Sequence, residues 1–457
     1  MESYGLSARG AANVEAIWPR IASAVADREQ QTEDSSIDMG TSENWLLRHE
    51  LIDLYKRAVQ DDLASKHLSY PDGFSGDQEL LRALSHFFNR FFKPCIPVET
   101  AHLATAPGAA YALDALLYNI CAVGDAILIP TPCWNGFDWL VKARSGVQPR
   151  FVKTQSLDRV FTSDVIEALE AAFSESTISI KGLLFTNPQN PLGQCYPESV
   201  IKDIIDFCNR KKIHFISDEI YALSRFSNMD TPDPVPFVSA LQIDVEGMGC
   251  DSSHVHTIWS TSKDLGSSGL RMVSPSPFVG FSPSILAGLN KSIFFQGCCI
   301  TQNNKPLAVG LALACNTQMS SLTAIASSRL LMSPELPHLL HLNSERLGRA
   351  YGTITSMLKS RGLTYIPANM GPFLFARLVP DAQTWEDEAD TVHACKEAGV
   401  SISAGRGYHV PDGEKGWARL NFALDPDRLA EALRRLGVGL DSALRKRGTV
   451  ERVGEYS

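Results

Sequence analysis

The sequence lacks the marks of several protein classes. None of its ten cysteines forms a Cys-x-x-Cys pair, and histidines at metal-ligand spacing are missing. No apolar stretch is long enough to span a bilayer, and "MESYGLSARGAANVEAIWPR" has no secretory-signal pattern. The formal net charge is -9 and no basic patch stands out. We therefore expect a cytoplasmic protein with reduced, mostly buried thiols, no metal, and neither membrane nor nucleic acid as a partner.

The length and composition predict a large globular core with a second lobe. The chain has 457 residues, a length that exceeds one typical domain. With 44% hydrophobic and 20% charged residues, its composition is that of an ordinary globular protein. We predict an N-terminal segment of a small domain at 1–65, a large domain at 66–335 and a C-terminal small domain at 336–457. The last of these contains a helical pattern, two strands ("FLFARL" and "WARLNFAL"), a closing helix begun at Asp425, and a loosely held polar tail.

The middle of the chain alternates short apolar strands with helices. Examples are the strands "DAILIPTP", "KGLLFTNP" and "IHFISDEI", and the helices "AAYALDALLYNIC" and "PESVIKDIIDFCNRKK". This alternation predicts a mostly parallel sheet covered on both faces. Ligands of such sheets bind at the carboxyl ends of the strands, so side chains that directly follow a strand are the candidates for chemistry.

Two charged residues follow strands in this way. Lys263, in "STSKDLGSSGLRMV", is flanked by small hydroxyl residues and precedes Arg271 by eight positions. Such a lysine is ordinarily a solvated charge, but lysine also binds carbonyl cofactors covalently, and a hydroxyl with an arginine can hold a phosphate. Asp218, in "FISDEIYALSRF", is either a helix N-cap or a buried carboxylate paired with a protonated pyridine nitrogen. Tyr221 could point its phenol at the same ring.

Three further stretches bear on a cofactor site. "FTNPQNPLGQ" cannot be helical because of its prolines, and alone it reads as a surface turn. "ATAPGAAYALDAL" is a small-residue loop that feeds a helix, whose N-terminal amides would bind phosphate well. "PTPCWNGF" places Trp134 on a proline-flanked loop, where the indole either packs against the core or stacks on a flat cofactor.

In chain order these motifs resemble the fold type I pyridoxal-phosphate enzymes. The order is a Gly/Ala loop, Trp, N-P-x-N-P-x-G, D-x-x-Y, S-x-S-K with an arginine eight residues later, and G-W-x-R. It is most similar to the branch of 1-aminocyclopropane-1-carboxylate synthase and the class I/II aminotransferases, from about residue 37 to residue 430. The resemblance implies an α/β fold: a three-layer α/β/α large domain that binds pyridoxal 5'-phosphate, and a smaller α/β domain. It also implies a homodimer with shared active sites and a small amino-acid substrate.

The resemblance implies a role for each residue that matches the family motifs. Lys263 would bind the cofactor covalently and then shuttle the Cα proton, while Asp218 would keep the pyridine nitrogen protonated. Asn190 and Tyr221 would hydrogen-bond the phenolate oxygen of the cofactor. The prolines of the Asn-Pro loop would then aim Asn190, and Gly193 would let the chain turn away.

The same resemblance assigns the remaining contacts. Trp134 would stack on the ring, and Arg419 in "GWARL" would grip the substrate α-carboxylate as a bidentate fork. The phosphate would be bound by Ser260, Arg271 and the amides of Ala109 and Ala110.

Some positions bear on the reaction or depart from the pattern. "MGTSENWL" resembles the L-A-E-N segment of the synthases and places Glu43 near the substrate amino group; the alternative is a solvated glutamate at a helix start. Phe74 stands where the family usually has a tyrosine that contacts phosphate across the dimer interface, so either Tyr70 substitutes or the pocket is altered. Ala110 replaces a frequent hydroxyl residue. These departures argue against a true 1-aminocyclopropane-1-carboxylate synthase.

The expected first step is Cα–H cleavage with Lys263 as the base. Plain transaminases need no acid at position 43, so Glu43 favours cleavage of a carbon–sulfur bond in an S-substituted amino acid, either a cysteine conjugate or S-adenosylmethionine. The alternative is transfer of the amino group to a 2-keto acid. A ligand-sensing regulator on this fold is disfavoured because no basic helix-turn-helix segment precedes residue 37.

Overall fold

A seven-stranded sheet forms the centre of the computed structural model, which describes residues 5–29, 36–268, 297–316 and 318–454. The strand order is β2-β8-β7-β6-β5-β3-β4. All neighbours pair in parallel except β8, which is antiparallel to β2 and β7. The strands are β2 (Leu103–Ala106), β3 (Ala126–Thr131), β4 (Gln148–Lys153), β5 (Ile180–Thr186), β6 (His214–Asp218), β7 (Val255–Ser260) and β8 (Gly297–Ile300).

Helices cover both faces of this sheet, as β3 shows. Ala126 and Leu128 pack in one buried cluster with residues of α6 and α7, whereas Ile127 and Ile129 pack in another with residues of α4, α5 and α10. The continuous apolar sequence of β3 follows from burial on both sides. The covering helices are α3 (Gln78–Phe91), α4 (Ala109–Ile120), α5 (Phe137–Ala143), α6 (Asp164–Ser174), α7 (Glu198–Lys211), α10 (Lys305–Cys315) and α11 (Ser321–Leu331). The predicted fold class is confirmed.

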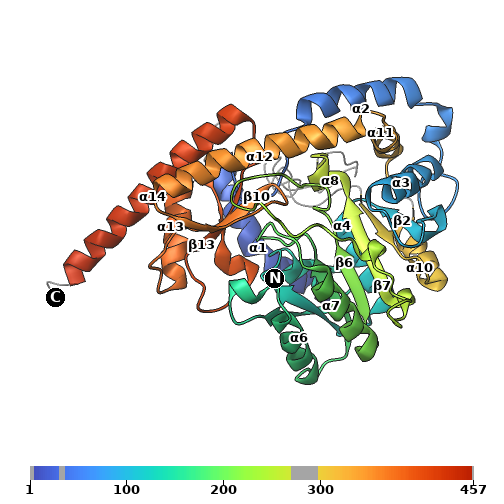
Figure 1. The fold of residues 1–457 in the computed structure, drawn as a ribbon, viewed down its shortest axis with the longest axis horizontal. Helices are drawn as coiled ribbons and strands as arrows, with labels where there is room; N and C mark the ends of the chain where they lie inside the picture. Colours follow the sequence, from blue (N-terminus) through green and yellow to red (C-terminus); the bar gives the residue numbers. More distant parts are fainter. Residues whose placement is uncertain (1–4, 30–35, 269–296, 317, 455–457) are drawn as a thin grey trace.

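A second, smaller sheet has the antiparallel order β12-β13-β10-β9. It lies beside the large sheet, and α12 extends from this region towards α11 (Figure 1). Its apolar side chains form a separate buried cluster with residues of α12 and α14. The elements are β9 (Thr364–Ile366), β10 (Phe373–Arg377), β12 (Ser403–Ala404), β13 (Trp417–Asn421), α12 (Leu336–Ser360), α13 (Trp385–Glu397) and α14 (Pro426–Gly454).

The N-terminal segment contacts both parts. Strand β1 (Ile37–Asp38) pairs in parallel with β11 (Val400–Ser401). Helix α2 (Arg48–Asp62) instead buries its leucines in a cluster with α3 and α11. Helix α1 (Ala8–Glu29) places Asn13 2.8 Å from the carbonyl oxygen of Ala143 at the end of α5. The predicted boundaries at residues 65 and 335 stay a prediction.

The structure bears on the predicted C-terminal tail and on the search for a membrane-spanning segment. Helix α14 continues to Gly454, so the polar tail predicted from residue 445 is helical up to that point. Among the helices in the described ranges, none combines the length and apolarity needed to cross a membrane.

Three histidines form a cluster at the amino ends of β6 and β7, opposite the strand ends that carry the candidate residues. His214 Nδ1 lies 2.8 Å from His256 Nε2, and the His254 ring lies 4.5 Å from that of His214. Asp251 lies 3.0 Å from His254 Nδ1. Burial, followed by the charge of His254, lowers the pKa of His214 to about 4.

This cluster predicts a loss of stability in mild acid. Between pH 6.5 and about 4, His214 is protonated in the unfolded chain but neutral in the folded chain. The free energy of unfolding therefore decreases as the pH is lowered through this range. In urea titrations, we expect the free energy of unfolding of the parent to decrease over this pH range by roughly 1–3 kcal/mol more than that of His214→Gln. His341→Gln, at an exposed position, is the control and should leave the slope unchanged. Identical slopes for His214→Gln and the parent would contradict the prediction.

Candidate active site

Lys263 lies directly after β7 on the short helix α8 (Thr261–Asp264). Ser260 caps this helix, because its hydroxyl accepts a hydrogen bond from the amide of Ser262 at 3.2 Å. The Lys263 ammonium donates to the backbone carbonyl of Ser42, which is more than two hundred residues away in the sequence. The predicted lysine therefore faces the segment around "GTSEN".

Buried polar neighbours fix the backbone on both sides of Lys263. Asp264 accepts hydrogen bonds from Trp259 Nε1 at 2.8 Å and from Ser224 Oγ at 2.6 Å. Asn44 donates to the carbonyl of Lys263 at 3.2 Å and to Asn343 Oδ1 at 2.9 Å. These residues were not predicted, since most of their contacts join segments that are distant in the chain.

Asp218 ends β6 and is half-buried. Its carboxylate accepts a hydrogen bond from the amide of Ile220 at 3.3 Å, and no ion pair of this carboxylate occurs within the described ranges. Burial raises the pKa of Asp218 to about 7, although Lys263 opposes the shift. Glu219 beside it is instead satisfied by Ser217, Ser239 and the amide of Ala240. A half-buried carboxylate with so few donors is suited to a cationic partner.

Tyr221 contacts the same segment that Lys263 touches. Its hydroxyl is 3.1 Å from Ser42 Oγ, and its ring packs edge-on against Phe373 with centroids 5.1 Å apart. Burial raises the pKa of Tyr221 to about 12, so the phenol stays protonated near neutral pH. Both the backbone and the side chain of Ser42 thus contact predicted site residues.

Asn190 and Arg419 meet although 229 positions separate them. Arg419 Nη1 donates to Asn190 Oδ1 at 2.9 Å, and Arg419 Nη2 donates to the carbonyl of Gly40 at 2.6 Å. The side chain is buried on β13, and its Nε has no hydrogen-bond partner among the described residues. The guanidinium therefore keeps a donor for a further ligand.

The Asn-Pro loop reaches this position by packing against the smaller sheet's side. Gly193 has φ +67, and a Cβ there would lie 2.6 Å from Ala368 Cβ and 2.9 Å from the carbonyl oxygen of Met370. The carbonyl of Gly193 accepts hydrogen bonds from the amides of Asn369 and Met370 at 2.9 and 3.0 Å. Only glycine fits this turn and this close approach.

The amides predicted to bind phosphate begin α4. Gly108, with φ +107, precedes Ala109 and makes no side-chain capping hydrogen bond. Gly297 of β8 lies against this turn so closely that a Cβ would collide with the Ala109 amide nitrogen. The first-turn amides and the positive end of the helix dipole are therefore suited to an anion, with no side-chain cap in their place. Gly297 was not predicted to contribute to this site, and its missing Cβ is what permits the close packing.

Trp134 follows β3 and packs edge-on against Phe137, with centroids 5.3 Å apart. Its indole lies over Gly136, where any Cβ would collide with the ring. The Gln189 side chain donates to the carbonyl of Pro132, which ties the Asn-Pro loop to the Trp134 loop. Two predicted cofactor contacts are thereby connected.

The Glu43 carboxylate has three hydrogen-bond partners of its own. Its carboxylate accepts from Trp45 Nε1 at 3.0 Å, from Arg48 Nη2 at 3.3 Å and from Ser268 Oγ at 3.4 Å. Phe74 and Tyr70 lie on the surface of the single chain, with 63% and 85% exposure. Arg271 lies outside the described residues.

The comparison with family models decides the affiliation. The model described as "Aminotransferase class I and II" matches residues 35–436. The chain belongs to this family. Its curated relatives include "Probable aminotransferase aclI" of Aspergillus oryzae, which is 54% identical over 432 residues, covering 94% of this chain and 97% of the relative.

More distant relatives confirm the predicted resemblance. "1-aminocyclopropane-1-carboxylate synthase 1" of Prunus mume is 26% identical over 414 residues, covering 88% of this chain and 77% of the relative. The solved structure of aspartate aminotransferase from Thermus thermophilus with maleate has a TM-score of 0.71 at 19% identity and covers 95% of this chain and 99% of that one. The structural likeness shows the fold.

The residues of this aminotransferase-family chain fit pyridoxal 5'-phosphate, the cofactor of the family. Asp218 is a carboxylate with a raised pKa and few donors, suited to a pyridinium, and the start of α4 is suited to a phosphate. The free Nε of Arg419 is suited to a carboxylate. When bound, the cofactor supplies an electron sink that makes the Cα–H bond of an amino acid acidic.

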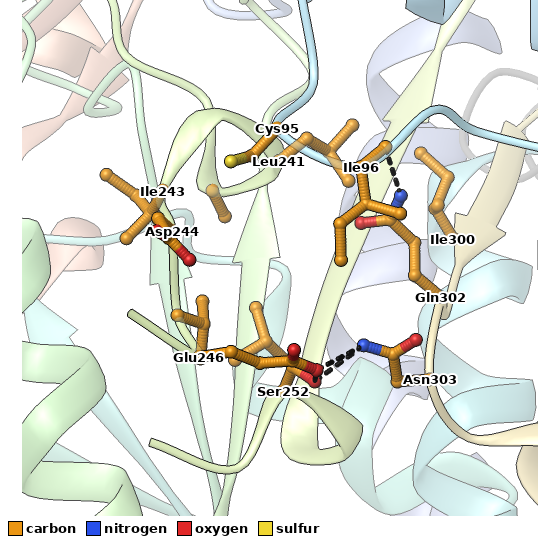
Figure 2. Close-up of a pocket in the computed structure, with 13 residues that line it drawn as sticks. Cys95, Ile96, Leu241, Ile243, Asp244, Glu246, Ser252, Ile300, Gln302 and Asn303 are labelled. Atoms are coloured by element: carbon orange, nitrogen blue, oxygen red, sulfur yellow. Dashed lines mark hydrogen bonds between the residues drawn. The ribbon is translucent and has the colours of Figure 1, made fainter. Parts of the chain in front are cut away.

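A separate surface pocket lies between the start of β7 and β8 (Figure 2). Its polar side chains satisfy one another: Asn303 donates to Ser252 Oγ at 2.6 Å and to Glu246 at 3.1 Å, and Gln302 donates to the carbonyl of Ile96 at 2.6 Å. None of the residues that line it was predicted to be functional. We assign it no role in the reaction.

Proposed function

We propose that this pyridoxal-phosphate enzyme of the aminotransferase class removes the Cα proton of an amino acid and then cleaves a carbon–sulfur bond in its side chain. The proposed substrate is an S-substituted amino acid, either a cysteine conjugate or S-adenosylmethionine. From a cysteine conjugate, β-elimination followed by hydrolysis with one water would give a thiol, a 2-keto acid and ammonia. From S-adenosylmethionine, whose sulfonium lies on Cγ, bond cleavage would release a neutral thioether.

Each predicted residue has a proposed part in this reaction. Lys263 attaches the cofactor and moves the proton at the substrate Cα, and Asp218 keeps the ring nitrogen protonated. Asn190 and Tyr221 donate to the phenolate oxygen, and Arg419 binds the substrate α-carboxylate. Trp134 stacks on the ring. The phosphate is bound by Ser260, Arg271 and the amides of Ala109 and Ala110.

The position of Glu43 supports bond cleavage over simple transamination. The segment 40–43 contacts both the proposed carboxylate-binding residue and the proposed cofactor lysine. The carbonyl of Gly40 accepts a hydrogen bond from Arg419, and that of Ser42 accepts one from Lys263. Glu43 follows at once, and Asn421 holds its carbonyl at 3.0 Å. Its carboxylate is 33% exposed and fixed by Trp45 and Arg48. An acid fixed beside the substrate region can protonate a departing thiolate, a task that transamination does not include.

Transamination is the second candidate, and the name of the relative from Aspergillus oryzae, a probable aminotransferase, favours it. In that case Lys263 would move the proton taken from Cα, and the amino group would pass to a 2-keto acid. Lys263, Asp218 and Arg419 would serve this reaction equally.

Single-turnover absorbance separates the two reactions. Holoenzyme is mixed with a panel of amino acids, cysteine S-conjugates and S-adenosylmethionine without any keto acid. For a lyase we expect the original spectrum to return while thiol and 2-keto acid accumulate over many turnovers. One stoichiometric conversion of the cofactor to its amine form, with no further product, would instead establish a transaminase and exclude the cleavage reaction.

Glu43→Gln tests the assignment of the acid in the same assay. We expect it to lower the rate of thiol release about 10–100-fold, while Cα-proton exchange with solvent changes less. Glu50→Gln is the matched control, because Glu50 pairs with Arg346 at 2.6 Å near the start of α2. Equal losses of exchange and thiol release in Glu43→Gln would contradict a role in the leaving-group step.

We further propose a cytoplasmic homodimer with shared active sites and the domain division at residues 65 and 335. The exposed Phe74 and Tyr70 lie on the stretch that contacts the neighbouring subunit's cofactor in this family. Sedimentation of the full chain tests the dimer. A monomer that binds cofactor and turns over would contradict it.

A further inference from the structure

Ser42 is a buried residue that no sequence motif singled out. It is 5% exposed, and its hydroxyl lies 3.1 Å from the Tyr221 hydroxyl. Its carbonyl accepts a hydrogen bond from the Lys263 ammonium. The family segment L-A-E-N has alanine where "TSEN" has Ser42. The hydroxyl is therefore a departure of this chain from that segment, placed against a proposed cofactor ligand.

The backbone that carries Ser42 is pinned on both sides. Arg419 donates to the carbonyl of Gly40 at 2.6 Å, and Asn421 donates to that of Glu43 at 3.0 Å. The Tyr221 ring is likewise held by its edge contact with Phe373. Although the Tyr221 ring and the Ser42 backbone are both fixed, the Tyr221 hydroxyl can still rotate about its C–O bond. The Ser42 hydroxyl lies within hydrogen-bond distance of it.

The count of protons sets the direction of the hydrogen bonds. A phenol has a single proton, which Tyr221 must give to the cofactor oxygen if it is to stabilise that oxygen. The Tyr221 oxygen is then free to accept, and Ser42 has a proton to donate. The resulting chain runs from Ser42 to Tyr221 to the cofactor, and each hydrogen bond in such a chain strengthens the next.

We propose that Ser42 is a positioning residue of the reaction, whose hydroxyl donates to Tyr221 and thereby directs the Tyr221 proton at the cofactor's phenolate oxygen. The inference rests on the proposed role of Tyr221. Ser42 acts through Tyr221 and has no contact of its own with the reacting atoms in this account.

The proposal predicts a spectroscopic effect. A donor to the phenolate oxygen reduces the negative charge that this oxygen presents to the neighbouring nitrogen, the one that links Lys263 to the cofactor. That nitrogen then holds its proton less tightly. Removing the donor raises the pH midpoint of the bound cofactor's absorbance change. We expect a rise of about half a pH unit for Ser42→Ala and about one unit for Tyr221→Phe.

The experiment is a pH titration of the absorbance of holoenzyme variants. Ser42→Ala introduces the residue of the family segment, and Ser42→Thr keeps the hydroxyl and should restore the parent midpoint. In the Tyr221→Phe background, Ser42→Ala should add no further shift, because its partner is gone. We also expect Ser42→Ala to lower kcat about 3–10-fold with KM changed less than about twofold.

The outcomes separate this inference from the role on which it rests. If Tyr221→Phe leaves the midpoint unchanged, the proposed role of Tyr221 fails, and the Ser42 proposal fails with it. If Tyr221→Phe shifts the midpoint but Ser42→Ala does not, the Ser42 proposal alone is overturned. An equal Ser42→Ala shift in both backgrounds would also overturn it, since the effect would not pass through Tyr221.

Discussion

Replacing Lys263 by alanine is expected to lower turnover by at least about 10⁴-fold, because one side chain both attaches the cofactor and moves the Cα proton. The ammonium lies at the end of β7, where it donates to Ser42 and acts electrostatically on Asp218. Turnover is measured with the substrate found in the single-turnover assay. Borohydride reduction followed by peptide mass spectrometry should place the cofactor on the Lys263 peptide of the parent, and on no peptide of the variant.

Lys263→Arg separates charge from chemistry. It keeps a cation near Asp218 but has no amine for covalent attachment, so we expect the same loss of turnover with better-preserved stability. Lys202→Ala, at an exposed helix pair with Glu198, is the remote control and should keep full activity. Cofactor on another lysine of the parent, or more than one per cent residual turnover in Lys263→Arg, would contradict the assignment.

The sheet could be predicted from the sequence because its signals are local. The apolar runs that became β3, β5 and β6 need burial on both faces, which only a covered parallel sheet supplies. Their shared direction also predicted that Asp218 and Lys263 would meet at one edge, since both follow a strand. The structure places them close enough for Lys263 to lower the pKa of Asp218.

The contacts between distant segments could not be predicted in this way. The motif "NPQNPLG" indicates a rigid loop, but its position follows from the fit of Gly193 against Ala368 and Met370. Ser42 and Asn343 carry no local signal, because a serine or an asparagine is common in any loop or helix. Their roles arise from partners more than 70 residues away, Tyr221 for Ser42 and Asp264 for Asn343.

Asp218→Asn is expected to lower kcat/KM by about 10²–10³-fold while leaving the cofactor-free protein at least as stable at pH 7. An amide cannot hold a ring nitrogen in its protonated form, so the electron sink weakens. Turnover and urea unfolding of both proteins from pH 4 to 7 provide the measurements.

The parent and Asp218→Asn should differ in the pH dependence of their stability. The cause is the raised pKa of Asp218 in the parent, about 7 in the folded chain against the ordinary value of 3.8. Between these values the folded state holds a proton that the unfolded state releases. This stabilises the fold below pH 3.8, and the contribution is lost as the pH rises towards 7. Asp218→Asn removes the contribution of this residue to the slope, while that of Glu219 remains. Bound cofactor should also flatten it in the parent, because a cationic ring lowers the carboxyl pKa.

Glu219→Gln is the matched control for the neighbouring buried carboxylate. Burial raises the pKa of Glu219 to about 7 as well, but Ser217, Ser239 and the Ala240 amide already donate to it. An amide NH₂ turned towards these donors leaves one of them unpaired, so we expect a loss of about 1–3 kcal/mol in stability. Turnover per folded molecule should be kept. If Asp218→Asn instead loses stability and keeps its turnover, Asp218 is a structural residue and the cationic ring does not bind there.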